Sequence, residues 1–191
     1  MLSVLESPTL RARISPLSVE SYHSLGEFNE HGRRTELIRG IVVEKMSKSH
    51  LHSSIATRLY RMILGLIPDG YSAWKEEPLT LRDSEPEPDI AVVKADWTAR
   101  DQGHPATAGL VIEVAVRNPD DDRALAEIYA EAGIGEYWVV LPKERAIEVF
   151  RQPEGLVYRE VRRYEFTDEL VCSTVPDVKI ALADLFAGIS A

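Results

Sequence analysis

Residues 109–141 read GLVIEVAVRNPDDDRALAEIYAEAGIGEYWVVL, and this stretch decides the fold. Its first segment, 109–116, is apolar except for Glu113, as expected of a central strand that is covered on both faces. The acidic run 120–122 provides helix caps before a periodic apolar segment that ends at Gly133, and 136–141 is apolar again. The stretch therefore predicts a strand, a helix and a second strand, which places the chain in the α/β class.

Apolar patterns and turn residues predict the remaining elements on either side of this unit. They are a short helix from Ser18 to Gly26, a hairpin at 36–46 with its turn at Gly40, an amphipathic helix from His50 that residues 68–70 end, a strand at 71–81 with an irregular middle, a short buried strand at 89–93, antiparallel edge strands in the tail and a short helix at 182–186.

Length and composition are those of one ordinary globular domain. The chain has 191 residues, of which 45% are hydrophobic and 28% are charged. That length suffices to bury a core without disulfides or a structural metal. Residues 1–15 lack a clear periodicity, so we expect a flexible N-terminal arm over 1–15 and a single domain over 16–191.

The cysteine content and the distribution of apolar residues predict a cytoplasmic protein. A lone cysteine, Cys172, excludes an internal disulfide framework and a multi-cysteine zinc site, and it is typical of a reducing compartment. The sequence shows neither a basic segment leading into an apolar signal core nor an apolar run near the ~20 residues that span a bilayer. We expect no contact with a membrane.

The net charge of −9 argues against broad, charge-driven binding to nucleic acid. The charges are unevenly distributed, however, and much of the acid lies at 83–89 and 120–131. One stretch gathers basic residues: Arg33, Arg34, Arg39, Lys45, Lys48, Arg58 and Arg61. This stretch is interpreted equally well as a phosphate-contacting face and as ordinary solvated surface.

Two carboxylates on short apolar strands carry the functional information. Ionised groups are seldom buried unless they are paired, hydrogen-bonded or bound to metal, so Asp89 and Glu113 need such a partner. The two-residue period of a strand turns Val114 away from Glu113 and leaves the Val114 carbonyl as a third oxygen ligand. Two carboxylates, a carbonyl and water suit Mg²⁺ or Mn²⁺.

Several segments together resemble the Uma-type putative restriction endonucleases of the PD-(D/E)xK nuclease superfamily. They are ELIRGIVVEKMSKS, His52 with Ile55 and Leu59, SEPEPDIAVV, GLVIEVAV and DDDRALAEIYAEAGIGEYWVV. The resemblance implies a restriction-endonuclease-like fold, a central mixed β-sheet flanked by helices. It also implies a Mg²⁺ or Mn²⁺ site made by Asp89, Glu113 and the Val114 carbonyl, with Glu36 as a further catalytic acid. The implied activity is hydrolysis of DNA phosphodiester bonds, and homodimerisation would serve cleavage of both strands.

The chain departs from this family at the lysine that accompanies the acids. The two positions where the family carries it are Ala115 and Leu125 here, and neither side chain can orient a water or neutralise a transition state. Lys75 and Arg123 are candidate replacements, whereas Lys94 should face the other side of its strand. Two hypotheses remain: a metal-dependent endonuclease, and a degenerate relative that binds nucleic acid or protein without catalysis. A purely structural protein whose acids form salt bridges is a third.

Each candidate residue also has an alternative interpretation without chemistry. Asp89 would cap a turn, Glu113 would pair with an arginine, and Glu36 would be solvated beside basic residues. His52 is either a structural histidine at a helix start or a contact to phosphate or to a metal ligand. The periodic aromatic residue Tyr129 is assigned to the core.

Overall fold

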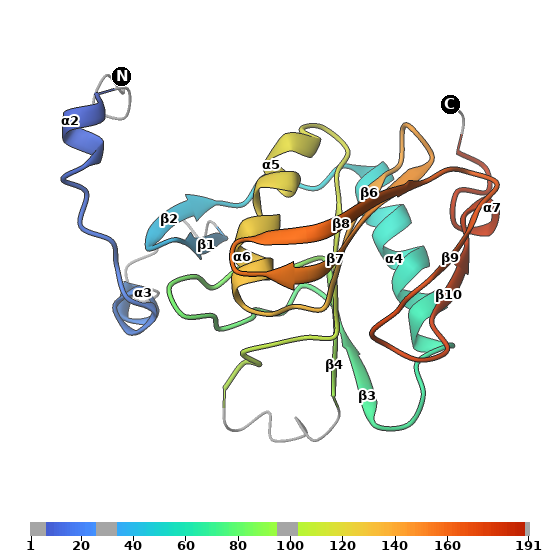
Figure 1. Cartoon of the computed structure of the whole chain (residues 1–191). Coiled ribbons are helices and arrows are strands. Elements are labelled where there is room, and N and C mark those ends of the chain that lie inside the picture. Colours follow the sequence, from blue (N-terminus) through green and yellow to red (C-terminus); the bar gives the residue numbers. More distant parts are fainter. Residues whose placement is uncertain (1–6, 26–33, 95–102, 190–191) are drawn as a thin grey trace. The chain divides into compact units, whose positions relative to one another are not determined.

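The computed structural model describes residues 7–25, 34–94 and 103–189 (Figure 1), and the chain divides into two compact units. The first unit comprises residues 1–45 with 82–86, and the second comprises 46–81 with 87–191. None of the helices in the described residues is both long and apolar enough to cross a membrane. The predicted arm over 1–15 and the single domain over 16–191 stay predictions.

The first unit holds two short helices and a hairpin. They are α2 (Pro8–Arg11), α3 (Val19–Leu25), β1 (Thr35–Ile38) and β2 (Ile41–Glu44). The hairpin turn requires glycine, because Gly40 has a φ of +74° and a Cβ there would lie 2.4 Å from the Cβ of Pro16. The predicted helix after Ser18 and the predicted hairpin are thus both present, while Gly26 lies outside the described residues.

A six-stranded mixed sheet forms the centre of the second unit. Its strands are β3 (Tyr71–Trp74), β4 (Ile90–Lys94), β5 (Leu110–Val114), β6 (Glu136–Leu141), β7 (Ala146–Glu154) and β8 (Val157–Tyr164), which lie side by side in that order. Only the β5–β6 pair within it is parallel, and the other neighbours are antiparallel. The predicted strand, helix and strand of 109–141 are therefore the parallel unit of a mixed sheet.

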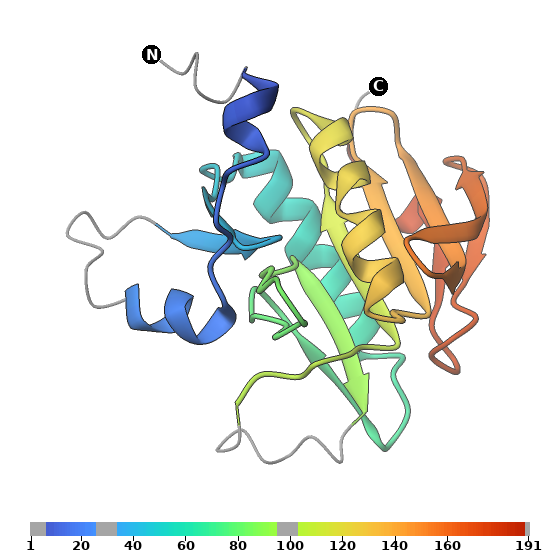
Figure 2. The same cartoon turned by 60° about the vertical axis from the view of Figure 1, so that its left-hand side comes forward.

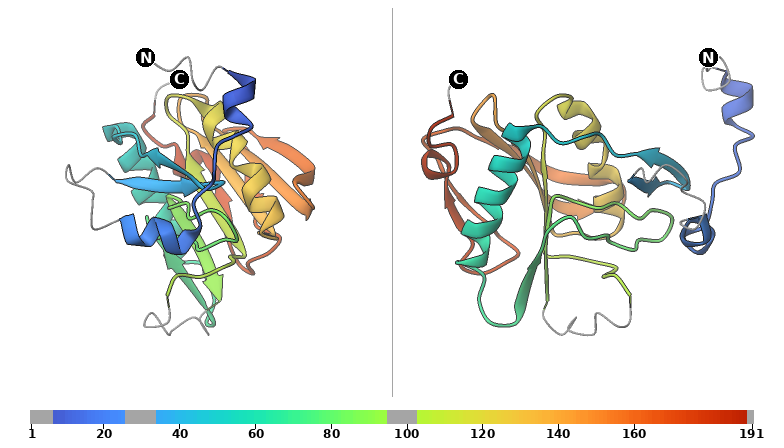
Figure 3. Two further views of the ribbon diagram at one scale, coloured as in Figure 1. Left: turned by 90° about the vertical axis from the view of Figure 1, so that its left-hand side faces the viewer. Right: turned by 180° about the vertical axis from the view of Figure 1, so that it is seen from behind.

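Both faces of this sheet are covered (Figures 2 and 3). One face carries α5 (Pro119–Ala124) and α6 (Ala126–Glu131), which the sequence predicted as one helix and which only Leu125 separates. The other face carries α4 (His50–Leu64), α7 (Leu182–Leu185) and the small sheet of β9 (Glu169–Val171) and β10 (Lys179–Ala181). The fold is thus the predicted mixed sheet flanked by helices.

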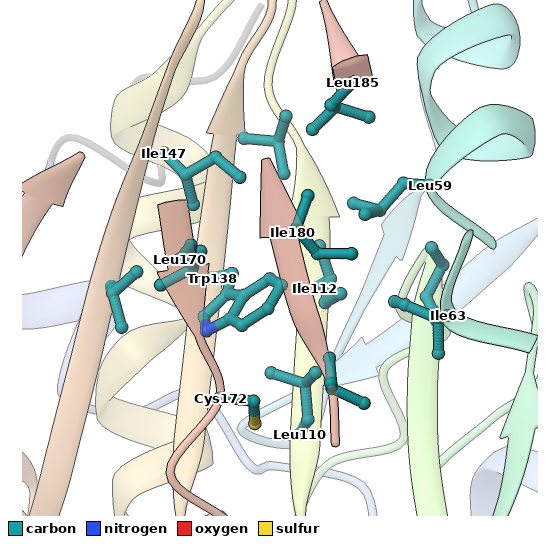
Figure 4. Packing of buried hydrophobic residues seen from close by; sticks show 14 of the residues in the cluster. Leu59, Ile63, Leu110, Ile112, Trp138, Ile147, Leu170, Cys172, Ile180 and Leu185 are labelled. Atoms are coloured by element: carbon teal, nitrogen blue, oxygen red, sulfur yellow. The ribbon is translucent and has the colours of Figure 1, made fainter. Parts of the chain in front are cut away.

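The main core lies between the sheet and the layer of α4, α7, β9 and β10 (Figure 4). Ile112 and Trp138 of neighbouring central strands contribute to it, and Leu59 and Ile63 come from the apolar face of α4. All four side chains are fully buried. The buried face of α4 has the three- and four-residue spacing that predicted the helix.

Two local features differ from the sequence prediction. The strand predicted at 71–81 ends at Trp74, because Glu76 has a φ of +57° and its N–H donates to the carbonyl of Asp89 at 3.3 Å. The chain therefore leaves the sheet two residues after Trp74. The strands β9 and β10 were not predicted, since segments of three residues are too short to show a period.

Candidate metal and nucleic-acid site

Asp89 and Glu113 lie side by side in the second unit, where two neighbouring strands position them. Asp89 immediately precedes β4 and Glu113 lies in β5, and the two strands are hydrogen-bonded neighbours. The backbone N–H of Asp89 donates to Oε2 of Glu113 at 3.1 Å. The residues are only 4% and 8% exposed, so the structure brings together the two carboxylates that the sequence singled out.

Three donors hold the carboxylate of Asp89. Nζ of Lys48 lies 2.8 Å from Oδ1, while Nε2 of His52 and the N–H of Val114 lie 2.8 and 2.9 Å from Oδ2. Burial by itself raises the pKa of Asp89, but the bonds and charges of His52 and Lys48 outweigh it and lower the pKa to about 2. Asp89 is therefore an anion at neutral pH.

A buried tyrosine orients Glu113. The hydroxyl of Tyr129, on α6, donates to Oε1 of Glu113 at 3.2 Å, and Tyr129 has no exposed surface. The sequence placed Tyr129 in the core, and it lies there. The apolar spacing alone could not reveal the hydrogen bond from its hydroxyl to Glu113.

The lysine of the site is Lys48, which comes from an unexpected part of the chain. It lies between β2 and α4, directly before Ser49, whose hydroxyl accepts the N–H of His52 at the start of α4. The same cap thus places Lys48 and His52 on either side of the Asp89 carboxylate. The sequence analysis counted Lys48 only among the basic residues, although it belongs to the MSKSH segment that precedes the helix.

Glu76 links Lys48 to the end of β3. Its carboxylate lies 3.1 Å from Nζ of Lys48 and 3.4 Å from Nζ of Lys75. A left-handed conformation is unfavourable for a residue with a side chain by about 1 kcal/mol. The backbone bond of Glu76 to Asp89 and the ion pair to Lys48 stabilise it at this position.

The other basic side chains considered as replacements have different partners. Lys75 contacts Glu76 and the hydroxyl of Thr57, the latter at 3.4 Å. Arg123 forms a two-pronged pair with Glu148, with both bonds at 2.7 Å. Lys94 is exposed at the end of β4. Lys48 is therefore the lysine that the structure places against Asp89.

Glu36 lies in β1 of the first unit and pairs with Nζ of Lys45 at 2.8 Å, so its membership of the site stays a prediction.

Asp122 lies in α5, where burial, the charge of Asp89 and the charge of Asp121 raise its pKa to about 7. The negative charge of Asp89 thus acts on Asp122 and disfavours its ionised form.

The donors of this site fit a hard divalent cation. Among the described residues no three His, Cys, Asp or Glu side chains converge on one point, so the protein side chains would supply two carboxylates. Oxygen ligands of this type, completed by a carbonyl and water, suit Mg²⁺ and Mn²⁺. Nδ1 of His52 is buried and has no hydrogen-bond partner in the described part of the chain, so it calls for a water or a ligand.

A third buried carboxylate shows what a purely structural acid looks like in this protein. Glu136 has no exposed surface and accepts bonds from Arg151 at 2.9 Å and from the indole N–H of Trp138 at 2.7 Å. The N–H and hydroxyl of Ser173 bind its other oxygen. The arginine pair that was considered for Glu113 is therefore found at Glu136.

A mixed six-stranded sheet flanked by helices, with one carboxylate directly before β4 and the other in β5, is the arrangement of a restriction-endonuclease-like fold. The chain belongs to the Uma2 family, described as putative restriction endonuclease, which matches residues 19–183. The family thus indicates a nuclease, a class of protein that binds nucleic acid.

One solved structure supports the same fold. It is the crystal structure of a putative nuclease belonging to DUF820 from Anabaena variabilis, which is 21% identical and superposes with a TM-score of 0.71. The match covers 90% of this chain and 98% of the other. No protein among those with curated descriptions matches the chain.

Proposed function

We propose that this protein is a metal-dependent DNA endonuclease that hydrolyses phosphodiester bonds. Asp89, Glu113 and the carbonyl of Val114 would hold Mg²⁺ or Mn²⁺. The observation that carries the proposal is the buried carboxylate pair, joined by the 3.1 Å bond from the Asp89 N–H to Glu113. Two buried acids side by side are costly unless cations compensate their charge.

The surrounding residues would each have a defined task. The metal ion, when bound, supplies an activated water and a positive charge beside the phosphate. Tyr129 holds Glu113 in its orientation through the 3.2 Å bond to Oε1. Lys48 takes the place of the family lysine, where its ammonium can orient a water and stabilise charge that develops on the phosphate.

Lys48 also balances part of the negative charge of the acid pair. Its Nζ, 2.8 Å from Oδ1, compensates the Asp89 charge, and the exposed fraction of the Lys48 side chain is 22%. A flexible lysine can move away when a divalent ion takes over that charge. Glu76, at 3.1 Å, is the second carboxylate to which the ammonium can turn.

A second candidate function is a nucleic-acid- or protein-binding module that has lost catalysis. Ala115 and Leu125 at the usual lysine positions favour it. The Lys48–Asp89 ion pair is compatible with it as well, because the pair partly neutralises the acids. This candidate predicts that the chain cleaves no DNA even if it binds metal.

Metal binding and cleavage should be measured separately. Calorimetric titration with Mn²⁺ and cleavage of supercoiled plasmid would be compared for the native chain and Asp89→Asn, with Asp69→Asn in an exposed turn as the matched control. Binding and cleavage that both disappear only in Asp89→Asn support the endonuclease. Binding of Mn²⁺ without cleavage supports the second candidate, and no binding of Mn²⁺ by the native chain refutes the metal-dependent endonuclease.

Three remaining expectations belong to the same proposal. Glu36 would act as a further acid, which cleavage assays of Glu36→Gln would test. A homodimer would cut both strands of a duplex, and light scattering during cleavage would reveal it. The cytoplasm is the expected compartment, given one cysteine in the chain.

A further inference from the structure

The solvent face of α4 forms an open groove of about 640 Å³. Its lining comes from this one helix and carries basic and hydroxyl side chains beside one methionine, namely His50, Ser53, Ser54, Thr57, Arg58, Arg61 and Met62. Of the described residues that line it, none is acidic. In a chain with a net charge of −9, such a surface is a local exception.

Helical spacing explains why these side chains gather. Positions separated by three, four, seven and eight residues share one face of a helix, and the lining residues follow this spacing from 50 to 61. The opposite face carries Ile55, Leu59 and Ile63, which are fully buried against the sheet. Burial of the apolar face therefore fixes the orientation of the polar face.

Two arginines give the groove its charge. Arg61 is exposed, and the described part of the chain offers its guanidinium no partner. Arg58 is anchored, because its NH1 donates to the carbonyls of Leu185 and Ala187 at 2.7 Å each. A guanidinium has five N–H donors, so Arg58 retains further donors after both bonds.

The groove is connected to the carboxylate site by a chain of polar contacts. Thr57, which lines the groove, accepts from Nζ of Lys75 at 3.4 Å, and Lys75 contacts Glu76 at 3.4 Å. Glu76 contacts Lys48 at 3.1 Å, which in turn contacts Asp89 at 2.8 Å. Two lysines and Glu76 thus link the groove on α4 to Asp89.

We propose that this face of α4 binds the phosphate backbone of DNA, and holds the strand whose phosphodiester bond lies at Asp89 and Glu113. Arginines and hydroxyls are the usual donors to phosphate oxygens, and such contacts position a strand without reading its bases. The proposal rests on the proposed function and names its substrate-docking surface. It assigns Arg61 as a docking residue that takes no part in catalysis.

The test is DNA binding in EDTA, where the metal site is empty and cleavage cannot interfere. Fluorescence anisotropy of a fluorescein-labelled DNA duplex would be followed over a series of salt concentrations for the native chain and Arg61→Gln. Loss of one phosphate contact should weaken binding several-fold and lower the slope of log K against log salt by about 1.

A control removes an arginine from the edge strand β8, which lies at the other end of the sheet from β3. Arg159 is exposed on the edge strand β8 and forms two bonds of 2.6 Å with the exposed Glu154, and Arg159→Gln changes the net charge by the same amount. It should retain native affinity and slope. Thr57→Val, which keeps the shape of the side chain, should also weaken binding.

The outcomes separate the two proposals. If Arg61→Gln binds with the native affinity and slope, or if the native chain does not bind the duplex, the α4 face is not the DNA surface. Either result leaves Mn²⁺ binding by Asp89 and Glu113 to be judged on its own. Equal weakening by Arg61→Gln and Arg159→Gln would show a general charge effect and would overturn the assignment.

Discussion

The ammonium of Lys48 lies 2.8 Å from Oδ1 of Asp89, although the two residues are 41 positions apart in the sequence. This contact brings a lysine to a pair of acids that lacks one at the two family positions. It makes Lys48 the residue whose replacement is most informative.

Lys48→Met should lower the rate of plasmid cleavage by about 10²- to 10³-fold, the usual loss when one electrostatic contact to a transition state is removed. Mn²⁺ affinity should stay the same or rise, because the ammonium no longer competes for Asp89. Single-turnover cleavage and calorimetry would measure the two effects. Lys94→Met, which removes an exposed lysine at the end of β4, is the control. Native cleavage by Lys48→Met would exclude the role of Lys48.

Asp89 should contribute to stability at neutral pH and lose that contribution in acid. Its pKa of about 2 in the folded protein lies below the ordinary value of 3.8, so its stabilisation is present above pH 4. This stabilisation of the folded state amounts to about 2 kcal/mol, and it is lost as the pH falls toward 2. Urea unfolding between pH 5 and pH 2 should show a smaller loss for Asp89→Asn than for the native chain. Equal losses would contradict the prediction.

The contribution of Asp122 to stability should depend on pH in the opposite sense to that of Asp89. Its pKa is raised to about 7, so the folded state binds a proton that the unfolded state releases above pH 3.8. The charge of Asp122 therefore destabilises the fold increasingly between pH 4 and pH 7, and the penalty persists above pH 7. Asp122→Asn should raise stability at pH 8 by roughly 1 to 2 kcal/mol, since solvent reduces the full effect. At pH 4 the variant and the native chain should unfold alike in urea.

Tyr129→Phe should weaken Mn²⁺ binding by about 10- to 100-fold, the range seen when the partner of a metal ligand is removed. The hydroxyl holds Glu113 at 3.2 Å, and phenylalanine fills the same space without it. Tyr158→Phe provides the matched control, because its hydroxyl donates to the carbonyl of Ile134 at 2.8 Å, away from the acids. If both variants bind Mn²⁺ equally, the hydroxyl of Tyr129 has only a structural role.

Arg151→Met should destabilise the protein by about 3 kcal/mol or more, because it leaves the fully buried Glu136 without its cation. The free energy of unfolding in urea would measure this loss. Mn²⁺ affinity of the folded variant should remain native, since Glu136 belongs to a separate network. A change in affinity would mean that the two buried acid networks are coupled.

The sequence predicted the elements that bury apolar residues with a regular period. The helix at His50, the strand around Glu113 and the strand at 136–141 are present because their spacing matches the face that each element buries. The end of β3 at Trp74 was not predictable, because it depends on the tertiary bond from Glu76 to Asp89. The three-residue strands β9 and β10 carry too little pattern to be recognised.

The site was predictable only in part, because the acids have a sequence signal and Lys48 has none. Asp89 and Glu113 stand out because a carboxylate in an apolar strand is unusual, and their strands prove to be neighbours. Lys48 has no such signal, since a lysine in a loop is ordinary. Its role depends on where the capped start of α4 places it, and this is a property of the packed fold.

The position of Lys48 bears on how relatives of this protein are judged active or inactive. A search that requires a lysine at a fixed distance after the glutamate would score Ala115 and Leu125 as losses and discard the chain. A lysine that enters from the segment before α4 preserves the charge while the linear motif disappears. Members of the family should therefore be sorted by the presence of an ammonium within reach of the acids in space, and their sequences aligned afterwards.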